Sequence, residues 1–310
     1  MDSLSPVEPL RDVPVAARPA RRRRSDTGMA LLLTGPFIIA YLVLFIYPTL
    51  KMAELSFTNA PLIGGGRFIG LHNYFRLARD HLFLASITHT VYFVVLTVIP
   101  NTLIGLGIAM LVNRLHGRLR AVVLACFFVP YVLPSTVVCQ IWEWVLDRQF
   151  GIAQIVIKAI TGHPISVFAN PLWAMPMVAL VTIWWTSGFN ILIFLAGLRN
   201  IPEDLYAAAA LDGAGRWRSF ASITWPLIWP VTALILTIQL ILQLKIFDQV
   251  YLLTEGGPFN STYVMVQYIY REAFGLDHGG YASTAALFLF VVIAALSLIQ
   301  IQVLRVRGSE

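Results

Sequence analysis

Long apolar runs separated by short polar segments fill the chain from residue 29 onward. Six runs approach or exceed the roughly 20 residues that a helix needs to cross a hydrocarbon core of about 30 Å. Each run should be helical, because lipid offers backbone amides no hydrogen-bond partner outside their own segment. The pattern predicts an all-α integral membrane protein with six transmembrane helices. The predicted spans are Met29–Tyr47, Ser86–Val112, Ala121–Leu146, Pro171–Leu198, Pro226–Leu244 and Tyr281–Leu304.

Composition agrees with this prediction. Hydrophobic residues make up 58% of the 310 positions and charged residues 12%, whereas soluble domains carry roughly 25% charged residues. Prolines occur inside the second, third and fourth predicted spans. Because proline removes a helical hydrogen bond, we expect kinks at these positions. They are Pro100, Pro130, Pro134 and Pro176.

The distribution of arginine predicts the orientation. Arginine is concentrated in the N-terminal segment, after the second and fourth spans, and after the last span. Cytoplasmic segments carry the excess of basic residues in membrane proteins, so both termini and residues 201–225 are predicted to be cytoplasmic. Residues 1–28, rich in Pro, Ala and Arg, are predicted to be a disordered basic tail, and residues 29–310 the transmembrane domain. This topology explains the net charge of +6, with membrane lipid as the partner and no nucleic acid.

Two loops are predicted to contain short helices. Phe150–Ile160 places Ile152, Ile155, Val156, Ala159 and Ile160 on one helical face, which is typical of a helix lying in the membrane interface. The second helix lies in a polar insert from Ile201 to Pro230, where Pro202, Glu203 and Asp204 mark a helix start. A turn is expected at Asp212-Gly213, because glycine tolerates positive φ. Such an insert either docks another protein or packs on its own bundle.

Polar side chains in the fourth and fifth spans indicate a substrate path. Helical spacing places Gln239, Leu242 and Gln243 on one face. Thr182, Trp185, Thr186 and Phe189 share a face of the fourth span. Amide and hydroxyl groups beside aromatic rings suit a sugar. The alternative is that Gln239 and Gln243 hydrogen-bond between helices, a contribution of roughly 0.6–2 kcal/mol each.

Several kinds of chemistry are missing from the sequence. It contains no G-x-x-x-x-G-K-[ST] phosphate-binding loop, no histidine spacing typical of a metal site and no nucleophile–base set, so we predict no catalytic or metal-binding residue in this chain. Lys245 and Asp248, three residues apart, either pair with each other or form a coupling-ion site. An ion-gradient-driven secondary transporter would carry acidic residues at mid-membrane, which the predicted spans almost lack. A membrane-embedded enzyme would carry clustered His, Asp or Glu, which is also missing.

The polar insert resembles the coupling loop of ATP-binding-cassette (ABC) importer permeases, specifically the maltose-type carbohydrate branch. The matching residues include Asp204-Leu205-Tyr206, Ala208-Ala209, Asp212-Gly213-Ala214, Ile223 and Pro226, together with Thr254 and Gly256-Gly257-Pro258. The family pattern begins Glu-Ala-Ala, but Ala207 stands at the place of the glutamate. One charged contact to an ATPase is therefore missing, and Glu203, Asp204 and Asp212 are the candidates to replace it.

The resemblance implies a function and a set of partners. The chain would be the permease subunit of a binding-protein-dependent sugar or polyol importer, a multi-pass protein of the bacterial inner membrane. The implied partners are a second homologous permease, two copies of an ATPase that uses ATP and Mg²⁺, and an extracytoplasmic solute-binding protein; the chain itself would hold no cofactor. The resemblance assigns sugar contacts to the same two helix faces. The implied ATPase contacts are Tyr206, Ala207, Ala208, Asp212 and Gly213.

Overall fold

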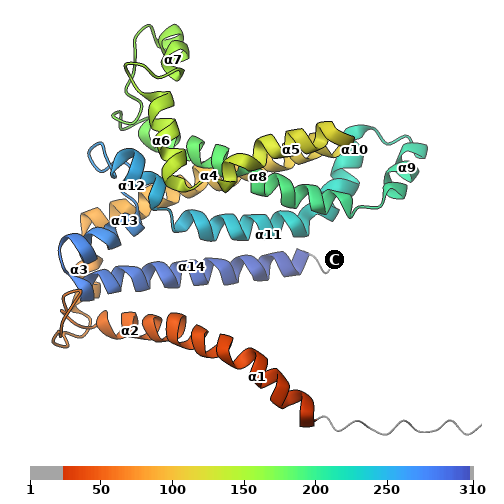
Figure 1. Cartoon of the computed structure of the whole chain (residues 1–310). Helices are drawn as coiled ribbons and strands as arrows, with labels where there is room; N and C mark the ends of the chain where they lie inside the picture. Colours follow the sequence, from red (N-terminus) through yellow and green to blue (C-terminus); the bar gives the residue numbers. More distant parts are fainter. Residues whose placement is uncertain (1–23, 308–310) are drawn as a thin grey trace, which may run out of the picture. The chain divides into compact units, whose positions relative to one another are not determined.

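The computed structural model describes residues 24–307, which form two units, residues 24–51 and 52–307 (Figure 1). Within the described residues the only β-structure is an isolated bridge between Thr58 and Phe68, so the predicted all-α class is confirmed. The predicted tail, residues 1–28, lies mostly outside the described residues. Helix α1 (Arg24–Tyr41) begins within the predicted tail range.

The first unit is a single apolar helical stretch. Helix α1 continues through a π-helical segment, η1 (Leu42–Ile46), into α2 (Tyr47–Leu55), whose last four residues belong to the second unit. Together these elements form a 28-residue membrane-span candidate, Gly28–Leu55. This stretch contains the predicted span Met29–Tyr47.

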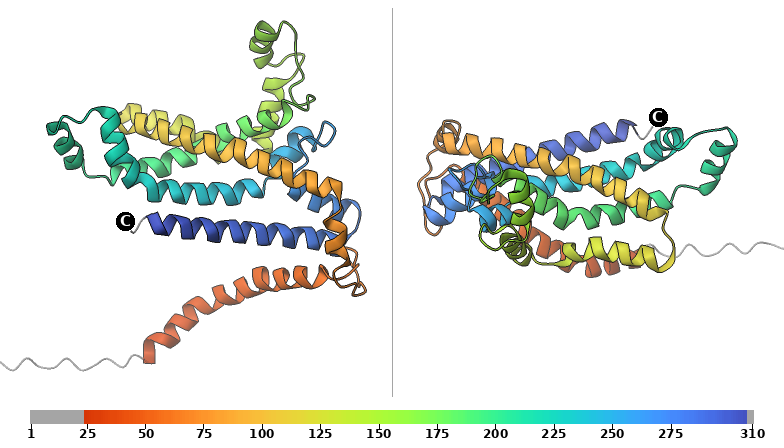
Figure 2. Two further views of the ribbon diagram at one scale, coloured as in Figure 1. Left: turned by 180° about the vertical axis from the view of Figure 1, so that it is seen from behind. Right: turned by 90° about the horizontal axis from the view of Figure 1, so that it is seen from above.

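The second unit contains the remaining helices (Figures 1 and 2). Four are long and apolar enough to cross a membrane alone, and a bent pair provides the sixth crossing if the pair is one span. In chain order the elements are α3 (His72–Leu77), α4 (His81–Asn113), α5 (Gly117–Val132), α6 (Ser135–Leu146), α7 (Ala153–Thr161), α8 (Ala174–Arg199), α9 (Glu203–Leu211), α10 (Arg216–Ser219), the π-helical η2 (Phe220–Thr224), α11 (Trp225–Leu244), α12 (Asp248–Thr254), α13 (Met265–Tyr270), the π-helical η3 (Arg271–Gly275) and α14 (Gly279–Arg307).

The predicted span Ala121–Leu146 is not one continuous helix. It consists of α5 and α6, whose axes differ by 103°. Leu133 between them is extended, with φ −70° and ψ 142°, because the ring of Pro134 disfavours a helical conformation in the residue before it. By contrast, α4 remains one helix through Pro100. Pro176 lies in the first turn of α8, where a missing N–H costs nothing.

The core of the second unit is built on α8. This helix packs against α4 and α5, and α11 packs against α4, α8 and α14. A Cβ atom added at Gly188 of α8 would collide with the backbone carbonyl of Phe127 in α5, so glycine permits the close approach of these helices. The largest buried cluster around α8 comprises Leu106, Ala109, Val112, Ile191, Phe194, Leu195, Leu198, Ile201, Ile228 and Ile235.

Asp80 joins three helices at the end of the bundle opposite α9. Its Oδ1 atom caps α4 by accepting hydrogen bonds from the backbone amides of Leu82 (2.9 Å) and Phe83 (3.1 Å). Its Oδ2 atom accepts from the hydroxyls of Tyr268 of α13 (2.7 Å) and Tyr281 of α14 (3.0 Å). Burial by itself raises the pKa of Asp80, but the four hydrogen bonds outweigh burial and hold this pKa below its usual value.

We predict that this carboxylate stabilises the fold in a pH-dependent way. Because its pKa is lowered on folding, the stabilisation is present above the unfolded-state pKa of about 3.9 and is lost as the pH falls through the folded-state pKa. Asp80→Asn should therefore lower the melting temperature at pH 7, where the lost charged hydrogen bonds are worth about 1–3 kcal/mol. The difference from wild type should shrink as the pH falls below about 4.

Thermal unfolding in detergent across this pH range measures both effects. Asp204→Asn serves as the control, because Asp204 is exposed and should not change the melting curve. An Asp80→Asn deficit that stayed constant down to pH 3 would show that the charge is not what stabilises the contact.

Candidate functional site

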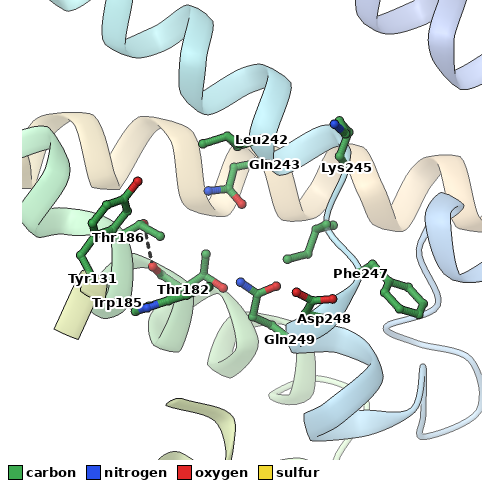
Figure 3. Close-up of a pocket in the computed structure, with 11 residues that line it drawn as sticks. Tyr131, Thr182, Trp185, Thr186, Leu242, Gln243, Lys245, Phe247, Asp248 and Gln249 are labelled. Atoms are coloured by element: carbon green, nitrogen blue, oxygen red, sulfur yellow. Dashed lines mark hydrogen bonds between the residues drawn. The ribbon is translucent and has the colours of Figure 1, made fainter. Parts of the chain in front are cut away.

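A cavity of ≈ 440 Å³ lies between α5, α8, α11 and the start of α12 (Figure 3). In Figure 3 the amides of Gln243 and Gln249 point into the space between these helices. The lining combines amides, hydroxyls, aromatic rings and one residue of each charge. The lining residues are Tyr131, Thr182, Trp185, Thr186, Leu242, Gln243, Lys245, Ile246, Phe247, Asp248 and Gln249.

Five of the seven residues predicted to bind substrate line this cavity, namely Thr182, Trp185, Thr186, Leu242 and Gln243. The other two do not. The ring of Phe189 stacks on the ring of Tyr131, with centroids 5.2 Å apart and planes 19° apart. Phe189 therefore contacts Tyr131, a residue of the cavity wall, without lining the cavity itself.

Gln239 takes part in a buried chain of hydrogen bonds across three spans. Its side chain is 1% exposed; its Nε2 donates to Asn190 Oδ1 (2.9 Å), and its Oε1 accepts from Gln243 Nε2 (3.0 Å). This series of hydrogen bonds continues with Asn190 Nδ2, which donates to the backbone carbonyl of Asn101 (3.4 Å). Asn101 Nδ2 in turn donates to Thr186 Oγ1 (2.8 Å). Gln239 thus has the inter-helix contacts that sequence analysis named as the alternative, whereas Gln243 reaches the cavity.

Three side-chain donors on α8 in the cavity wall are already in use. The hydroxyl of Thr182 donates to the carbonyl of Val178 (2.8 Å), and the hydroxyl of Thr186 donates to the carbonyl of Thr182 (2.7 Å). Trp185 Nε1 donates to the carbonyl of Leu133 (3.2 Å). These groups therefore present oxygen lone pairs and a ring face to the cavity, and a ligand that donates hydrogen bonds fits them.

Sequence analysis did not assign α5 or the α11–α12 junction to the substrate path, although it named Lys245 and Asp248 as an ion pair or a coupling-ion site. Lys245, Phe247, Asp248 and Gln249 follow directly after the Gln239–Gln243 face, and Tyr131 precedes the break at Pro134. Neither segment continues the helical spacing of the predicted faces, so periodicity could not find them. Lys245 and Asp248 both line the cavity, and among the described residues no ion pair joins them.

The break between α5 and α6 is tied to the cavity on both sides. Before Pro134, the carbonyl of Leu133 accepts the indole N–H of Trp185 on α8. After Pro134, the hydroxyl of Ser135 donates to Asp248 Oδ2 (3.2 Å) at the start of α12. The residues on either side of the break therefore contact two different helices that line the cavity, α8 and α12.

The predicted coupling loop forms a separate element at one end of the bundle (Figures 1 and 2). Helix α9 ends at Leu211, and Gly213 follows with φ +74°, as expected from the Asp212-Gly213 turn. The amide of Ala214 donates to the carbonyl of Ala209 (2.9 Å) and closes the turn. Ala207, Ala208, Asp212 and Gly213 are exposed and available to a partner.

Tyr206, also predicted to contact an ATPase, faces its own bundle. Its hydroxyl lies 2.9 Å from Thr224 Oγ1 of η2, and its ring packs against the main core cluster, which includes Ile201. These contacts fix α9 to the bundle at both ends of the loop. Two large apolar residues that sequence analysis did not single out as contacts are exposed nearby, Leu211 (90%) and Trp217 (78%).

No group of three or more metal-ligating side chains occurs among residues 24–307. The ≈ 440 Å³ cavity and the α9 loop contain most of the predicted site residues. Both suit a protein that binds a polar solute and contacts a partner, and neither contains a reactive constellation.

Comparison with known proteins gives a consistent result. Residues 101–308, which include the cavity and the α9 loop, match the family described as binding-protein-dependent transport system inner membrane component. The sulfoquinovosyl glycerol transport system permease protein SmoG of Agrobacterium fabrum is 32% identical, over 91% of this chain and 92% of that protein. The trehalose/maltose transport system permease protein MalF of Thermococcus litoralis is 31% identical, over 92% of this chain and 96% of that protein.

The fold is also found in a solved structure. A chain of a bacterial ABC transporter involved in the import of the acidic polysaccharide alginate superposes with a TM-score of 0.82 at 24% identity, over 92% of this chain and 99% of that chain. The same kind of transporter, in complex with an alginate pentasaccharide-bound periplasmic protein, gives a TM-score of 0.79 at 24% identity, over 90% of this chain and 93% of that chain. The helical arrangement described above is therefore an ABC importer permease fold.

Proteins of this family are inner-membrane permease components of ABC importers, in which ATP hydrolysis belongs to a separate subunit. The family match covers more than half of the chain, and the relatives align over nearly its whole length. The chain belongs to the family of binding-protein-dependent transport system inner membrane components.

Proposed function

We propose that this chain forms half of the translocation pathway of an ATP-driven importer for sugars or related polyols. The observation that carries the proposal is the ≈ 440 Å³ cavity, whose walls combine the ring of Trp185 and the ring of Tyr131 with oxygen acceptors. A sugar donates hydrogen bonds through its hydroxyls and packs its C–H faces on aromatic rings. The names of the relatives, which refer to sulfoquinovosyl glycerol and to trehalose and maltose, support this class of substrate.

The residues of the cavity have distinct roles in this proposal. The rings of Trp185 and Tyr131 position the sugar, and the stacked Phe189 keeps the Tyr131 ring in place. Gln243 Oε1 and Thr182 Oγ1 accept hydrogen bonds from substrate hydroxyls, because the hydroxyl of Thr182 and one N–H of the Gln243 amide are engaged elsewhere. Gln239 orients the Gln243 amide and does not contact the substrate.

The proposed transporter contains further subunits. A second homologous permease supplies the other half of the pathway, and two ATPase copies that use ATP and Mg²⁺ bind the α9 loops. An extracytoplasmic solute-binding protein delivers substrate at the opposite end of the bundle. A related alginate transporter has been solved with its periplasmic protein, which supports this arrangement. Both chain termini and the α9 loop then face the cytoplasm.

The α9 loop is the proposed transmission element. Ala207, Ala208, Leu211 and Asp212 form its exposed surface, and small side chains let a partner backbone approach closely. The Tyr206–Thr224 contact ties this surface to η2, which continues into α11 and so leads to Gln243 at the cavity. ATP-driven closure of the ATPase pair would move α9 and, through α11, the cavity wall.

An ion-gradient-driven transporter is the alternative from a different class. It requires ionisable residues buried at mid-membrane. Among the described residues Glu272 is the only buried carboxylate, and it lies in η3, outside the candidate spans. This distribution favours ATP as the energy source.

Reconstitution separates the two energy sources. The chain is co-expressed with its partner subunits, purified, placed in vesicles, and assayed with the binding protein for uptake of labelled maltose, trehalose and sulfoquinovosyl glycerol. We expect that at least one of these sugars is taken up. Its uptake should require ATP on the side of the vesicle membrane where the ATPase subunits lie, and a protonophore should not reduce it. Uptake by the chain alone, driven by a proton or sodium gradient, would refute the proposal.

We predict that Gly213→Pro uncouples the transporter. Proline cannot adopt φ +74° and would remove the hydrogen bond from the Gly213 amide to the carbonyl of Ala210 (3.1 Å). Substrate-stimulated ATP hydrolysis should fall to the basal rate while the binding protein still docks. Gly213→Asn is the matched control, because asparagine tolerates this conformation, and it should keep most of the stimulation. If Gly213→Pro retained normal stimulation, the turn would have no part in coupling.

Two glutamine variants should separate a substrate contact from a structural one. Gln243→Leu should lower uptake about two- to tenfold, because one hydrogen bond to the substrate is worth about 0.5–1.5 kcal/mol. Gln239→Leu leaves Asn190 Oδ1 buried without a partner, which costs about 1–3 kcal/mol of stability. It should lower the melting temperature more than Gln243→Leu does, because Gln239→Leu removes the hydrogen bonds to both Asn190 and Gln243, whereas Gln243→Leu removes only the one to Gln239 Oε1. Uptake is measured per folded complex, and equal effects of both variants on both measurements would contradict the assignment.

A further inference from the structure

Helix α7 carries an apolar face that the described chain leaves uncovered. Ile155 is 73% exposed and Ile160 78% exposed, and Ile152, Val156 and the preceding Phe150 are also exposed. In a soluble loop such a face would be turned inward. Sequence spacing alone predicted the face but not which way it points.

A buried glutamine fixes the direction of this face. Gln154 is 7% exposed, and its Nε2 atom donates to the carbonyls of Leu146 (3.1 Å) and Ile165 (2.9 Å). The amide of Ile165 donates back to Gln154 Oε1 (3.2 Å). Because the polar residue is anchored inward, the isoleucine face must point away from the protein, so its exposure is built into the fold.

The helix lies at the side of the bundle, near one end of the spans. The 103° bend directs α6 away from the direction of α5, and α7 follows α6 to the side (Figures 1 and 2). Nine residues reach only about 13.5 Å at 1.5 Å per residue, too short to cross a bilayer. The helix therefore suits a position along a membrane surface, at the end opposite α9.

An apolar cavity of ≈ 320 Å³ connects α7 to the start of α8, which is a membrane-span candidate. Its only hydroxyl, on Thr161, lies within hydrogen-bond distance of the carbonyls of Ile157 (2.7 Å) and His163 (2.8 Å), so its one hydrogen is in use, and the indole N–H of Trp173 is the remaining side-chain donor of the lining. An alkyl chain fits such a lining and a sugar does not. The lining residues are Ile157, Ile160, Thr161, Ile165, Val167, Trp173 and Met177.

Charge and aromatic placement identify the occupant as lipid. Residues 149–173 contain Lys158 and His163 but no aspartate or glutamate, and a lysine beside an apolar face attracts anionic headgroups. Trp173, which is half exposed at the cavity rim, is the residue type enriched at the level of the headgroups.

We propose that α7 and the adjacent cavity bind an anionic phospholipid, with an acyl chain in the cavity and the headgroup at Lys158. The isoleucine face then lies in the surrounding acyl chains, and α7 anchors the end of α6 in the leaflet opposite the α9 end. The proposal stands independently of the transported substrate.

Spin labels test the position of the face. Cys126→Ser and Cys139→Ala remove the native thiols, and single labels are placed by Ile155→Cys, Ile160→Cys and, as the control, Gln149→Cys. The full-length chain, with the subunits that co-purify with it, is reconstituted in vesicles of phosphatidylcholine and phosphatidylglycerol. We expect labels at 155 and 160 to collide with oxygen and not with a water-soluble nickel chelate, and the label at 149 to show the reverse preference.

Each other outcome overturns the proposal. Nickel collisions at 155 and 160 would place the face in water, and loss of collisions with both reagents would place it against a partner protein. Native mass spectrometry tests the headgroup contact: Lys158→Gln should retain fewer phosphatidylglycerol molecules than wild type, whereas Lys245→Gln, which changes a lysine away from α7, should retain the same number. Equal retention in all three proteins would remove Lys158 from the site.

Discussion

Within a bilayer a polar side chain has to find its hydrogen-bond partner inside the protein, and this requirement organises the centre of the bundle. The amide chain that runs from Gln243 through Gln239 and Asn190 to Asn101 joins α11, α8 and α4. Its last member is Thr186, which accepts a hydrogen bond from Asn101 and also lines the cavity. The same contacts that hold three spans together therefore set the positions of the polar groups that face the cavity. The Oδ1 atom of Asn101 is the one fully buried side-chain atom of this hydrogen-bond network that has no partner among the described residues.

The positions of the spans could be predicted from the length of the apolar runs alone, because the hydrocarbon core imposes one minimum length on every crossing. The division of Ala121–Leu146 into α5 and α6 did not follow, although four span prolines were noted. Pro100 lies within a continuous helix and Pro176 in a first turn, whereas Pro134 breaks its span. A proline breaks a helix where the freed backbone groups find other partners, and at Leu133 that partner is the indole of Trp185. Such a tertiary contact leaves no mark in the local sequence.

In the candidate site, too, contacts with other helices decide the position of single side chains, and the local sequence does not reveal these contacts. Gln239 and Gln243 lie on one face of α11 and are equivalent by spacing, yet only Gln243 lines the cavity, because Asn190 on another helix binds Gln239. Tyr206 was placed with the α9 contact surface by resemblance, but Thr224 binds its hydroxyl and turns it toward the core. By contrast, the turn at Gly213 was predictable, since positive φ is a local property that residue type reports directly.

The hydrogen bonds on either side of Pro134 have a mechanical consequence. Leu133 is held by α8 through Trp185, and Ser135 is held by α12 through Asp248. If α8 and α12 were to separate while both hydrogen bonds persisted, the two attachment points would be pulled apart across a single proline, and the backbone on either side of it would rotate. The angle between α5 and α6 would then change together with the width of the cavity.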